Sequence, residues 1–535
     1  MEQQSLRRRA PWLAAILAPC ALLSAPSYAA QPGDPAVAFD ITGFAVEGNT
    51  LLRPAVIQTA LKPYAGSHRS FDAIEQAMAA LQRLYRRRGY SLVKVTLPEQ
   101  ELKNGVVRLT VVETRIGSVR VHGNQFHGTD NVRRSLPGAT EGAIPDTDAL
   151  AADLKLANAN PSKQVEMQVQ GGTQPGTVDV VERVTDSKPW TATALLDNSG
   201  YESSGRDHVT AQYQYADLWG LDHVVSAQYT TSLEDPGSVR VYGAGYHIPL
   251  YGLGDTLDFY ASYSTVNSGT VAAGPLDLSV TGAGAVFGMR FTHELPRLGA
   301  WSSQLIAGFD RKEFRNDVSY QGQPLGSDVT VDPLSLSYDG QWALSAGGIN
   351  FYLTLARNIP GGSQGDDANF TTARAGGDPQ YGMLRYGAGY TRQLPAQWLL
   401  RLTVNGQSTR DALVPGEQFG IGGATSVRGL AERQLTGDKG FTANVELHTP
   451  DLCSRLLDGV THCNALTFLD DGHVYSNDAL PGEPGHQSAV STGVGLRLVR
   501  GRNLSLQMDY GRVVSASDPT QQGDQRLHAS LQVSY

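Results

Sequence analysis

Alternation between apolar and polar side chains along residues 190–535 constrains the fold more than any other feature of this sequence. The last segment is the cleanest example. Its apolar positions are Leu527, Ala529, Leu531, Val533 and Tyr535. Every residue between them is polar. A period of two predicts a β-strand with one apolar and one polar face, and a long series of such strands predicts a large sheet between two different environments.

The alternating segments are joined by connections that are alternately short and long. Further examples of the pattern are Val209–Tyr215, Leu257–Tyr263, Phe351–Leu355 and Leu504–Tyr510. At roughly 22 residues for each strand with its connection, residues 188–535 predict about sixteen antiparallel strands, an even number that returns both ends to one side. This is the plan of a transmembrane β-barrel, although a soluble sandwich would alternate as well.

The start of the chain predicts export. Three arginines (Arg7–Arg9) precede the apolar run Trp12–Leu23, and the small residues Ala29 and Ala30 follow it, so residues 1–29 are expected to be a cleaved signal peptide. No later stretch approaches the roughly 20 apolar residues of a membrane-spanning helix. Tyr, at 22 residues, outnumbers Phe and Trp, which suits the aromatic girdles of a barrel. Any membrane crossing is therefore expected to be made by strands.

An internal repeat follows the signal and a short segment, residues 30–38. Phe44–Asn49 recurs as Val119–Asn124, and each copy reads as a strand ending in Gly-Asn, two helical stretches and two further strands. The repeat predicts two small α+β domains, at residues 39–114 and 115–187.

This βααββ plan resembles the POTRA domain, the periplasmic module placed before outer-membrane translocase barrels. The resemblance implies that each domain receives an extended polypeptide by adding a strand to an exposed sheet edge. Near the end of a predicted helix, Arg83, Arg86, Arg87 and Arg88 could steer an acidic segment of such a client. They could equally be a solvated helix end that complements the helix dipole.

The longest connection, residues 411–440, is the candidate for function, because long loops in compact folds are usually functional or disordered. Gly420, Gly422 and Gly423 allow a tight return of the chain. Arg428 would then lie in a confined lumen, where a guanidinium requires a carboxylate partner.

The partner is expected on the strand-like run that ends at residue 472. If Leu469 faces lipid, Phe468, Asp470 and Gly472 face the lumen. The opposite phase would place Asp470 in lipid, which is energetically expensive. We therefore expect Arg428 to pair with Asp470 rather than with Asp471.

Two motifs then resemble one family. Val427-Arg428-Gly429-Leu430 is similar to the VRGY/F motif in the sixth extracellular loop of TpsB two-partner secretion transporters, the ShlB/FhaC/HecB group, although Leu430 replaces the usual aromatic residue. Phe468–Gly472 is similar to their F-x-D-x-G strand motif. The resemblance covers the mature chain and implies an outer-membrane pore that passes an unfolded exported partner to the cell surface, with the loop held inward by Arg428 and Asp470.

The implied partners are a secreted TpsA-like exoprotein (an adhesin, cytolysin or similar), outer-membrane lipid, and the barrel-assembly machinery, to which a terminal aromatic residue such as Tyr535 is a signal. The alternative is a BamA-like insertase, which usually carries more POTRA copies. Neither function needs catalytic residues, a cofactor or a metal, so we expect no enzyme. The net charge of −9 gives no reason to expect nucleic acid.

Two further expectations concern closure and cross-linking. Family members with an N-terminal plug helix need a longer leading segment than residues 30–38, so we expect no plug here, or a loop that does more of the closing. Cys453 and Cys463 bracket a turn in an oxidising compartment, which predicts a structural disulfide.

Overall fold

The computed structural model describes residues 38–535, except residues 201–204, 238, 266–268, 274–275, 281–282, 316–318, 321–322, 325–326, 454–458 and 519. The expected signal peptide, most of the short segment 30–38 and the question of a plug therefore lie outside the described residues. None of the helices that the structure describes is both long and apolar enough to cross a membrane.

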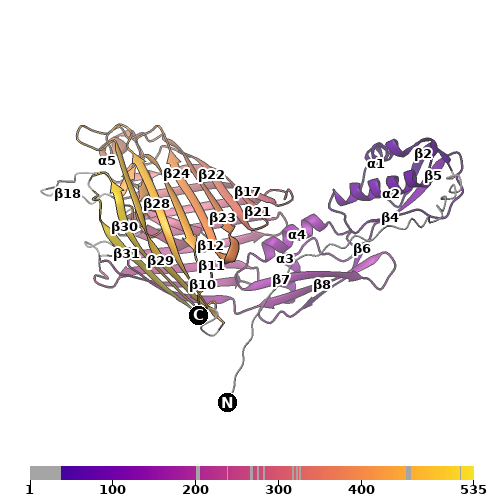
Figure 1. Ribbon diagram of the computed structural model, residues 1–535, viewed down its shortest axis with the longest axis horizontal. Helices are drawn as coiled ribbons and strands as arrows, with labels where there is room; N and C mark the ends of the chain where they lie inside the picture. Colours follow the sequence, from indigo (N-terminus) through magenta and orange to yellow (C-terminus); the bar gives the residue numbers. More distant parts are fainter. Residues whose placement is uncertain are drawn as a thin grey trace, which may run out of the picture. The chain divides into compact units, whose positions relative to one another are not determined.

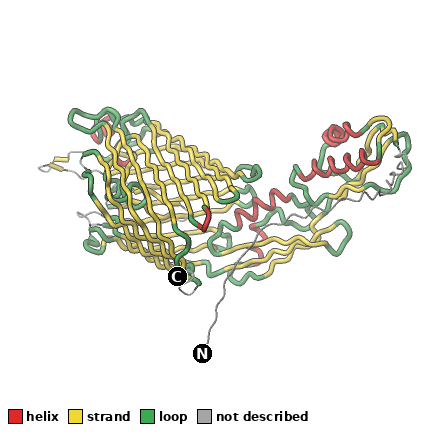
Figure 2. Tube along the Cα trace, viewed as in Figure 1, coloured by secondary structure: helices red, strands yellow, loops and turns green. Residues whose placement is uncertain are grey.

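A closed antiparallel barrel makes up most of the chain (Figures 1 and 2). Its strands are β9 (Trp190–Asp197), β10 (His208–Leu218), β11 (His223–Ser232), β12 (Val241–Leu250), β13 (Asp255–Ser264), β16 (Gly284–Glu294), β17 (Trp301–Phe314), β20 (Val329–Val331), β21 (Pro333–Leu344), β22 (Gly347–Asn358), β23 (Gly382–Gln393), β24 (Leu399–Ser408), β27 (Lys439–His448), β28 (Thr461–Tyr475), β29 (His486–Arg500), β30 (Leu504–Ala516) and β31 (Gln525–Ser534). β20 and β21 pair with successive parts of β17 and therefore occupy a single position in the ring. The described strands thus form a closed ring of sixteen, and the predicted fold class is confirmed.

The ring closes where the last strand meets the first. β31 pairs with β9 from Ser530, opposite Asp197, to Ser534, opposite Thr193. Beyond the paired residues, the ring of Tyr535 lies 5.5 Å from that of Trp190. Every described strand of the ring therefore pairs with a neighbour on both sides, as a barrel in lipid requires.

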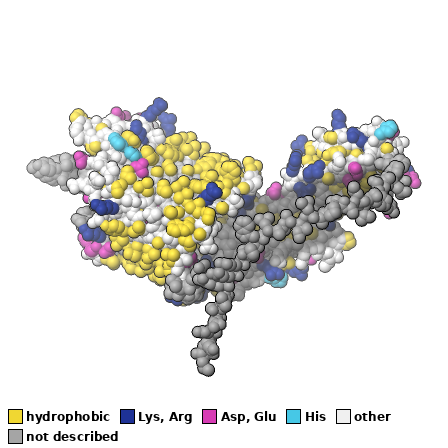
Figure 3. Space-filling view, viewed as in Figure 1, with side chains coloured by type: hydrophobic (Ala, Val, Ile, Leu, Met, Phe, Trp, Pro, Cys, Tyr) yellow, Lys and Arg dark blue, Asp and Glu magenta, His cyan; other side chains and the backbone are white. Residues whose placement is uncertain are grey.

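The two faces of the wall differ as the alternation predicts. Leu469 and Val494 are exposed on the outside, whereas Asp470, the next residue of β28, and Ser491, three residues before Val494 on β29, are fully buried on the inside. The same holds for β31, where Leu527 is outward and His528 is inward. Hydrophobic side chains accordingly cover a broad area of the barrel surface in Figure 3.

The N-terminal repeat forms two sheets of the same topology. Domain 1 contains β1 (Phe39–Ile41), β2 (Gly43–Glu47), α1 (Pro54–Leu61), η1 (Lys62–Tyr64), β3 (Gly66–Arg69), α2 (Phe71–Arg86), β4 (Lys94–Thr96) and β5 (Val106–Val112). Domain 2 contains β6 (Arg115–His122), α3 (Thr129–Ser135), α4 (Thr147–Ala157), β7 (Lys163–Gly171) and β8 (Thr177–Asp186). The three-stranded sheets have the orders β2-β5-β4 and β6-β8-β7, each with one parallel and one antiparallel pairing.

The repeated Gly-Asn step has the same structural cause in both domains. Gly48 and Gly123 directly follow β2 and β6 and have φ values of 80° and 92°, which favour glycine. A Cβ atom at Gly48 would lie 2.3 Å from the carbonyl oxygen of Val111, and one at Gly123 would lie 2.4 Å from that of Val184. Each glycine thus lets the chain leave the sheet close to the last strand.

A buried ion pair joins domain 2 to the barrel. The Nζ atom of Lys163, on β7, lies 2.5 Å from Asp222, in the turn between β10 and β11, and both side chains are inaccessible to solvent. Lys163 also donates to Asn131, and Tyr251, in the next turn on that side, donates to Asp222 over 2.6 Å. Burial lowers the pKa of Lys163, an effect that the neighbouring carboxylate of Asp222 opposes.

The core of domain 2 also holds an acid. Glu182, on β8, is completely buried, and neither carboxylate oxygen has a hydrogen-bond partner among the described residues. Burial raises the pKa of Glu182 to about 7, against the attraction of Arg133 and Lys163. The folded domain therefore holds this proton more tightly than the unfolded chain does.

We predict that domain 2 loses stability as the pH rises from about 4.5 to about 7, because Glu182 must ionise while buried. The loss should be up to about 3 kcal/mol, and Glu182→Gln should remove this pH dependence. Hydrogen–deuterium exchange of β6 to β8 in the whole protein, corrected for the intrinsic effect of pH, measures it. Equal pH dependence in wild type and variant would contradict the assignment.

Candidate functional site

The long connection between β24 and β27 folds back into the barrel. It contains a 3₁₀ turn, η3 (Pro415–Glu417), and a short hairpin of β25 (Phe419–Ile421) and β26 (Leu435–Gly437). Apolar residues of the loop and of the lumenal wall form one buried cluster. Its members are Ile421, Val427, Leu430 and Leu435 of the loop with Val474, Ala489 and Val513 of the wall. The loop is therefore packed against β28, β29 and β30.

Arg428 at the tip of the loop is bound by Asp470 of β28. The Nη2 and Nε atoms of Arg428 donate to Oδ1 and Oδ2 of Asp470 over 2.6 and 2.8 Å, and the backbone N–H of Arg428 donates to Oδ2 over 3.1 Å. Arg428 is 2% exposed and Asp470 is fully buried. This planar, two-pronged contact is the geometry in which a guanidinium binds a carboxylate most strongly.

A second acid completes the arrangement. Glu446 of β27 accepts from Nη1 of Arg428 over 2.7 Å, and Asp509 of β30 lies 3.8 Å from the same atom. Asn444 bridges the two partners, because it donates to the carbonyl of Ser426 in the loop and to Asp470 in the wall. The guanidinium also lies 3.5 Å from the centre of the Phe468 ring. One cation is thus bound by acids from two neighbouring wall strands, β27 and β28, with a third acid close by on β30.

Wall glycines make room for the two motifs. A Cβ atom at Gly472 would lie 2.7 Å from Val427, and one at Gly493 would lie 2.5 Å from the Phe468 ring. A Cβ atom at Gly511 would lie 2.6 Å from the backbone of Arg428. The loop therefore approaches the wall more closely than any larger residue would permit.

The loop glycines serve its own turns. Gly422, Gly423 and Gly429 have φ values of 114°, 102° and 101°. A Cβ atom at Gly422 would lie 2.3 Å from the carbonyl oxygen of Ala431, on the other arm of the hairpin. These positions need glycine both for the backbone angle and for the close approach.

The base of the loop has its own buried charges. Glu417 accepts from Lys312 of β17 over 2.7 Å and from Arg385 of β23 over 3.0 Å. Asp438, at the other end of the loop, accepts from Arg374 over 2.9 Å, next to the short helix α5 (Asp367–Ala373). The loop is held at its tip and at both ends by ion pairs.

Comparison with known proteins identifies the family. A family model described as haemolysin secretion/activation protein ShlB/FhaC/HecB matches residues 176–498, and one described as POTRA domain, ShlB-type, matches residues 39–114. The chain belongs to the ShlB/FhaC/HecB family.

Similar proteins agree with this assignment. The outer membrane transporter CdiB of Dickeya dadantii is 26% identical over 78% of this chain and 74% of its own length. The hemolysin transporter protein ShlB of Serratia marcescens is 26% identical over 94% of this chain and 87% of its own length. The structure of CdiB from Escherichia coli superposes with a TM-score of 0.78 at 21% identity, covering 95% of this chain and 93% of that one.

The protein is therefore an outer-membrane two-partner secretion transporter whose N-terminal POTRA domains lie in the periplasm. The long loops and the ends of β28 and β29 near residues 475 and 486 are consequently extracellular. The alternative of a BamA-like insertase is less supported, because the matching family is described as a secretion/activation protein and both relatives are named as transporters.

Several residues of this transporter could not be assigned from sequence. Glu446 and Asn444 lie on β27 and Gly511 lies on β30, so only the pairing of the wall strands brings them to Arg428. The alternation along β27 indicates the orientation of Glu446 but not its partner. Val445 faces outward, so the next residue, Glu446, faces the lumen. Leu430, where the family usually has an aromatic residue, is buried in the apolar cluster between loop and wall.

Other predicted residues lie apart from the loop. Cys453 and Cys463 are joined by a disulfide in the structure, next to the start of β28. Arg83, on α2, and Arg86 to Arg88, at and after its end, are exposed. Among the described residues, one group of acids and histidine has ligand atoms close enough for a metal ion, His127, Asp217 and Asp222. The Nζ atom of Lys163 lies 2.5 Å from Asp222, so this carboxylate already has a cation partner within the protein.

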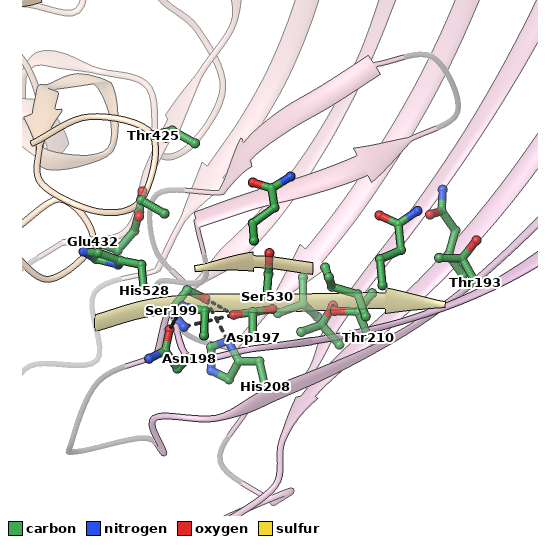
Figure 4. Close-up of a pocket in the computed structure, with 18 of the residues that line it drawn as sticks. Thr193, Asp197, Asn198, Ser199, His208, Thr210, Thr425, Glu432, His528 and Ser530 are labelled. Carbon is green, nitrogen blue, oxygen red and sulfur yellow. Dashed lines mark hydrogen bonds between the residues drawn. The ribbon is translucent and has the colours of Figure 1, made fainter. Parts of the chain in front are cut away.

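A polar cavity remains beside the loop (Figure 4). It has a volume of about 370 Å³ and lies between the loop residues Thr425 and Glu432 and the wall strands β9, β10 and β31. Its wall is formed by side chains such as Asp197, Thr210 and Ser530. In the described structure the loop therefore leaves a water-accessible space next to the seam between the first and last strands.

We predict that Gly511→Ala loosens the tip of the loop, because its new methyl group would collide with the backbone of Arg428. Overpacking of this kind costs about 1–3 kcal/mol. Hydrogen–deuterium exchange of residues 424–434 should be correspondingly faster. Gly382→Ala is the matched control, since its methyl group would meet nothing closer than 3.9 Å. Equal exchange in the two variants would contradict the close approach of loop and wall.

Proposed function

We propose that this transporter receives its exported partner in an unfolded state on the two POTRA domains and passes it through the barrel lumen, with the loop held inward by Arg428. The partner is a secreted exoprotein of the TpsA type. Related proteins are named as a hemolysin transporter protein, ShlB, and as an outer membrane transporter, CdiB, which supports this proposal. No catalytic residue is needed for this step, and we infer that the chain is neither an enzyme nor dependent on a cofactor.

The observation that carries the proposal is the burial of Arg428 between Asp470 and Glu446. A buried guanidinium with two carboxylates is stable only while all three groups stay together, because a charge left alone inside a protein costs several kcal/mol. The contact therefore defines one position of the loop rather than a range. We infer that this is the working position.

Docking on the POTRA domains would use backbone pairing. In the sheets β2-β5-β4 and β6-β8-β7, the outer strands can accept an added strand, and this kind of recognition tolerates many sequences. The exposed cluster Arg83, Arg86, Arg87 and Arg88 would favour an acidic client segment. The proposed domain limits are residues 39–114 and 115–187.

Two further partners belong to the proposal. The apolar outer face of the barrel would contact outer-membrane lipid directly. The exposed terminal Tyr535, beside Trp190, would present the last strand to the barrel-assembly machinery during biogenesis. The disulfide between Cys453 and Cys463 is assigned a structural role at the periplasmic end of β28.

The test is Arg428→Ala. Removing the guanidinium leaves Asp470 and Glu446 buried without a counter-ion, so the loop should leave its position and secretion of the partner should fall at least tenfold. Arg428→Lys should restore secretion only partly, because an ammonium group cannot bind both carboxylates in the same plane. Immunoblotting of partner protein in the medium measures secretion.

Arg290→Ala is the control for the loss of a partly buried ion pair in the lumenal wall. Arg290 binds Asp310 through two contacts of 2.9 Å, but both residues belong to the wall, on β16 and β17. Assembly of each barrel is checked by its heat-modifiable migration in gels. Normal secretion by an assembled Arg428→Ala protein would refute the role of the loop.

A further inference from the structure

Two arginines face outward at the extracellular end of the barrel wall. Arg357 lies near the end of β22, in the same phase as the exposed Leu353 and Leu355. Arg410 lies just beyond the end of β24 and continues the outward phase of Val404. Both arginine side chains are exposed, and within the part of the chain that the structure describes neither has a hydrogen-bond or ion-pair partner.

The lack of an acid partner sets these two arginines apart from another outward arginine. Arg311 of β17 lies 3.6 Å from Glu313 and 3.3 Å from Asp332. Asp411 follows Arg410, but its Oδ2 accepts from the backbone N–H of Gly382 over 2.8 Å and makes no ion pair with a described residue. Two guanidinium groups thus face one carboxylate, and positive charge remains for a ligand.

An apolar groove lies next to the two arginines on the outer face of the barrel. It has a volume of about 710 Å³, and both arginines line it. Leu336 of β21, Leu355 of β22 and Leu384 of β23 are partners in the strand register and form a row across the groove. Arg357 is the next outward residue of β22 after Leu355, on the extracellular side. The cationic groups therefore lie directly outside a row of leucines.

Gly382 of β23 separates the two arginines. It is the register partner of Arg357, and hydrogen bonds of 2.7 and 2.8 Å join it to Thr409 and Asp411, on either side of Arg410. Because β23 lies between β22 and β24, the backbones that carry the arginines are roughly 10 Å apart. A Cβ atom at Gly382 would meet nothing closer than 3.9 Å. This open space admits a group the size of a phosphate within reach of both side chains.

We propose that the groove binds a phosphate-bearing lipid of the outer leaflet, with lipid A as the representative. Arginine binds phosphate through two parallel N–H···O bonds, and clustered basic groups at a membrane surface attract anionic head groups. The phosphate lies between Arg357 and Arg410, and an acyl chain covers the row of leucines. A free phosphate would leave that row uncovered. The site rests on the proposed contact of the outer face with lipid and adds one preferred lipid to it.

The site adjoins the loop that carries Arg428. Arg410 immediately precedes the long connection, residues 411–440. Asn477, after β28, donates to the carbonyl oxygens of Thr409 and Asp411 over 3.3 and 3.0 Å. A lipid held by Arg410 therefore binds at the anchored start of this loop.

The test is binding of diphosphoryl lipid A to the purified full-length protein in detergent, measured by native mass spectrometry. Arg357→Gln and Arg410→Gln should each weaken binding about tenfold, because each removes a charge-assisted contact. Arg392→Gln is the matched control and should bind as wild type does. Arg392 is exposed on the same outward face, at the periplasmic end of β23, and its replacement changes the net charge equally.

Two competitors identify the ligand. Phosphatidylethanolamine has acyl chains but no net charge, and it should displace lipid A poorly. Inorganic phosphate should not displace it, and displacement would make the groove a phosphate site and overturn the lipid assignment. If wild type shows no preference for lipid A, or if the two variants bind it as Arg392→Gln does, the arginines only extend into interfacial water and the proposal is overturned.

The assay is independent of secretion. Heat-modifiable migration confirms that each variant is assembled before lipid is added. No exported partner is present, so loss of the lipid site would leave the role of Arg428 unaffected. Normal secretion by Arg428→Ala would likewise leave lipid binding unaffected.

Discussion

A positive charge removed from water is the constraint on which the inside of this barrel depends. The guanidinium of Arg428 is almost fully buried, and it contacts two carboxylates and an aromatic face. Such a group is tolerated only with its partners in place. The loop, the phase of β28 and the position of β27 are therefore mutually determined, since a shift in any one of them would leave a buried charge unpaired.

The same principle acts at the base of the loop. Glu417 and Asp438 are buried acids, and their cations come from strands β17 and β23 and from the segment after α5. Between tip and base the contacts are apolar or rely on glycine. The loop thus resembles a small domain, with ion pairs at its tip and base and an apolar core between them. The barrel wall has no side chains at Gly472, Gly493 and Gly511, which leaves room for the loop and for the Phe468 ring.

Local pattern predicted much of this structure. The strict alternation of β31 fixed which residues face outward, and the expense of a carboxylate in lipid selected Asp470 over Asp471. What the sequence could not supply was pairing across strands. Glu446 and Gly511 lie 18 and 83 residues from Arg428, and Lys312 lies 105 residues from Glu417, so their contacts exist only through the register of the closed ring.

The buried pair of Lys163 and Asp222 has a mechanical consequence. Rotation of the second POTRA domain relative to the barrel would separate a buried ammonium group from its carboxylate partner. Tyr251 of the barrel also packs into the hydrophobic core of that domain. Any movement of the domain relative to the turns that carry Asp222 and Tyr251 therefore has to separate these buried groups. A force applied to the periplasmic strand β7 would therefore act directly on the periplasmic turn that carries Asp222, at the edge of the barrel.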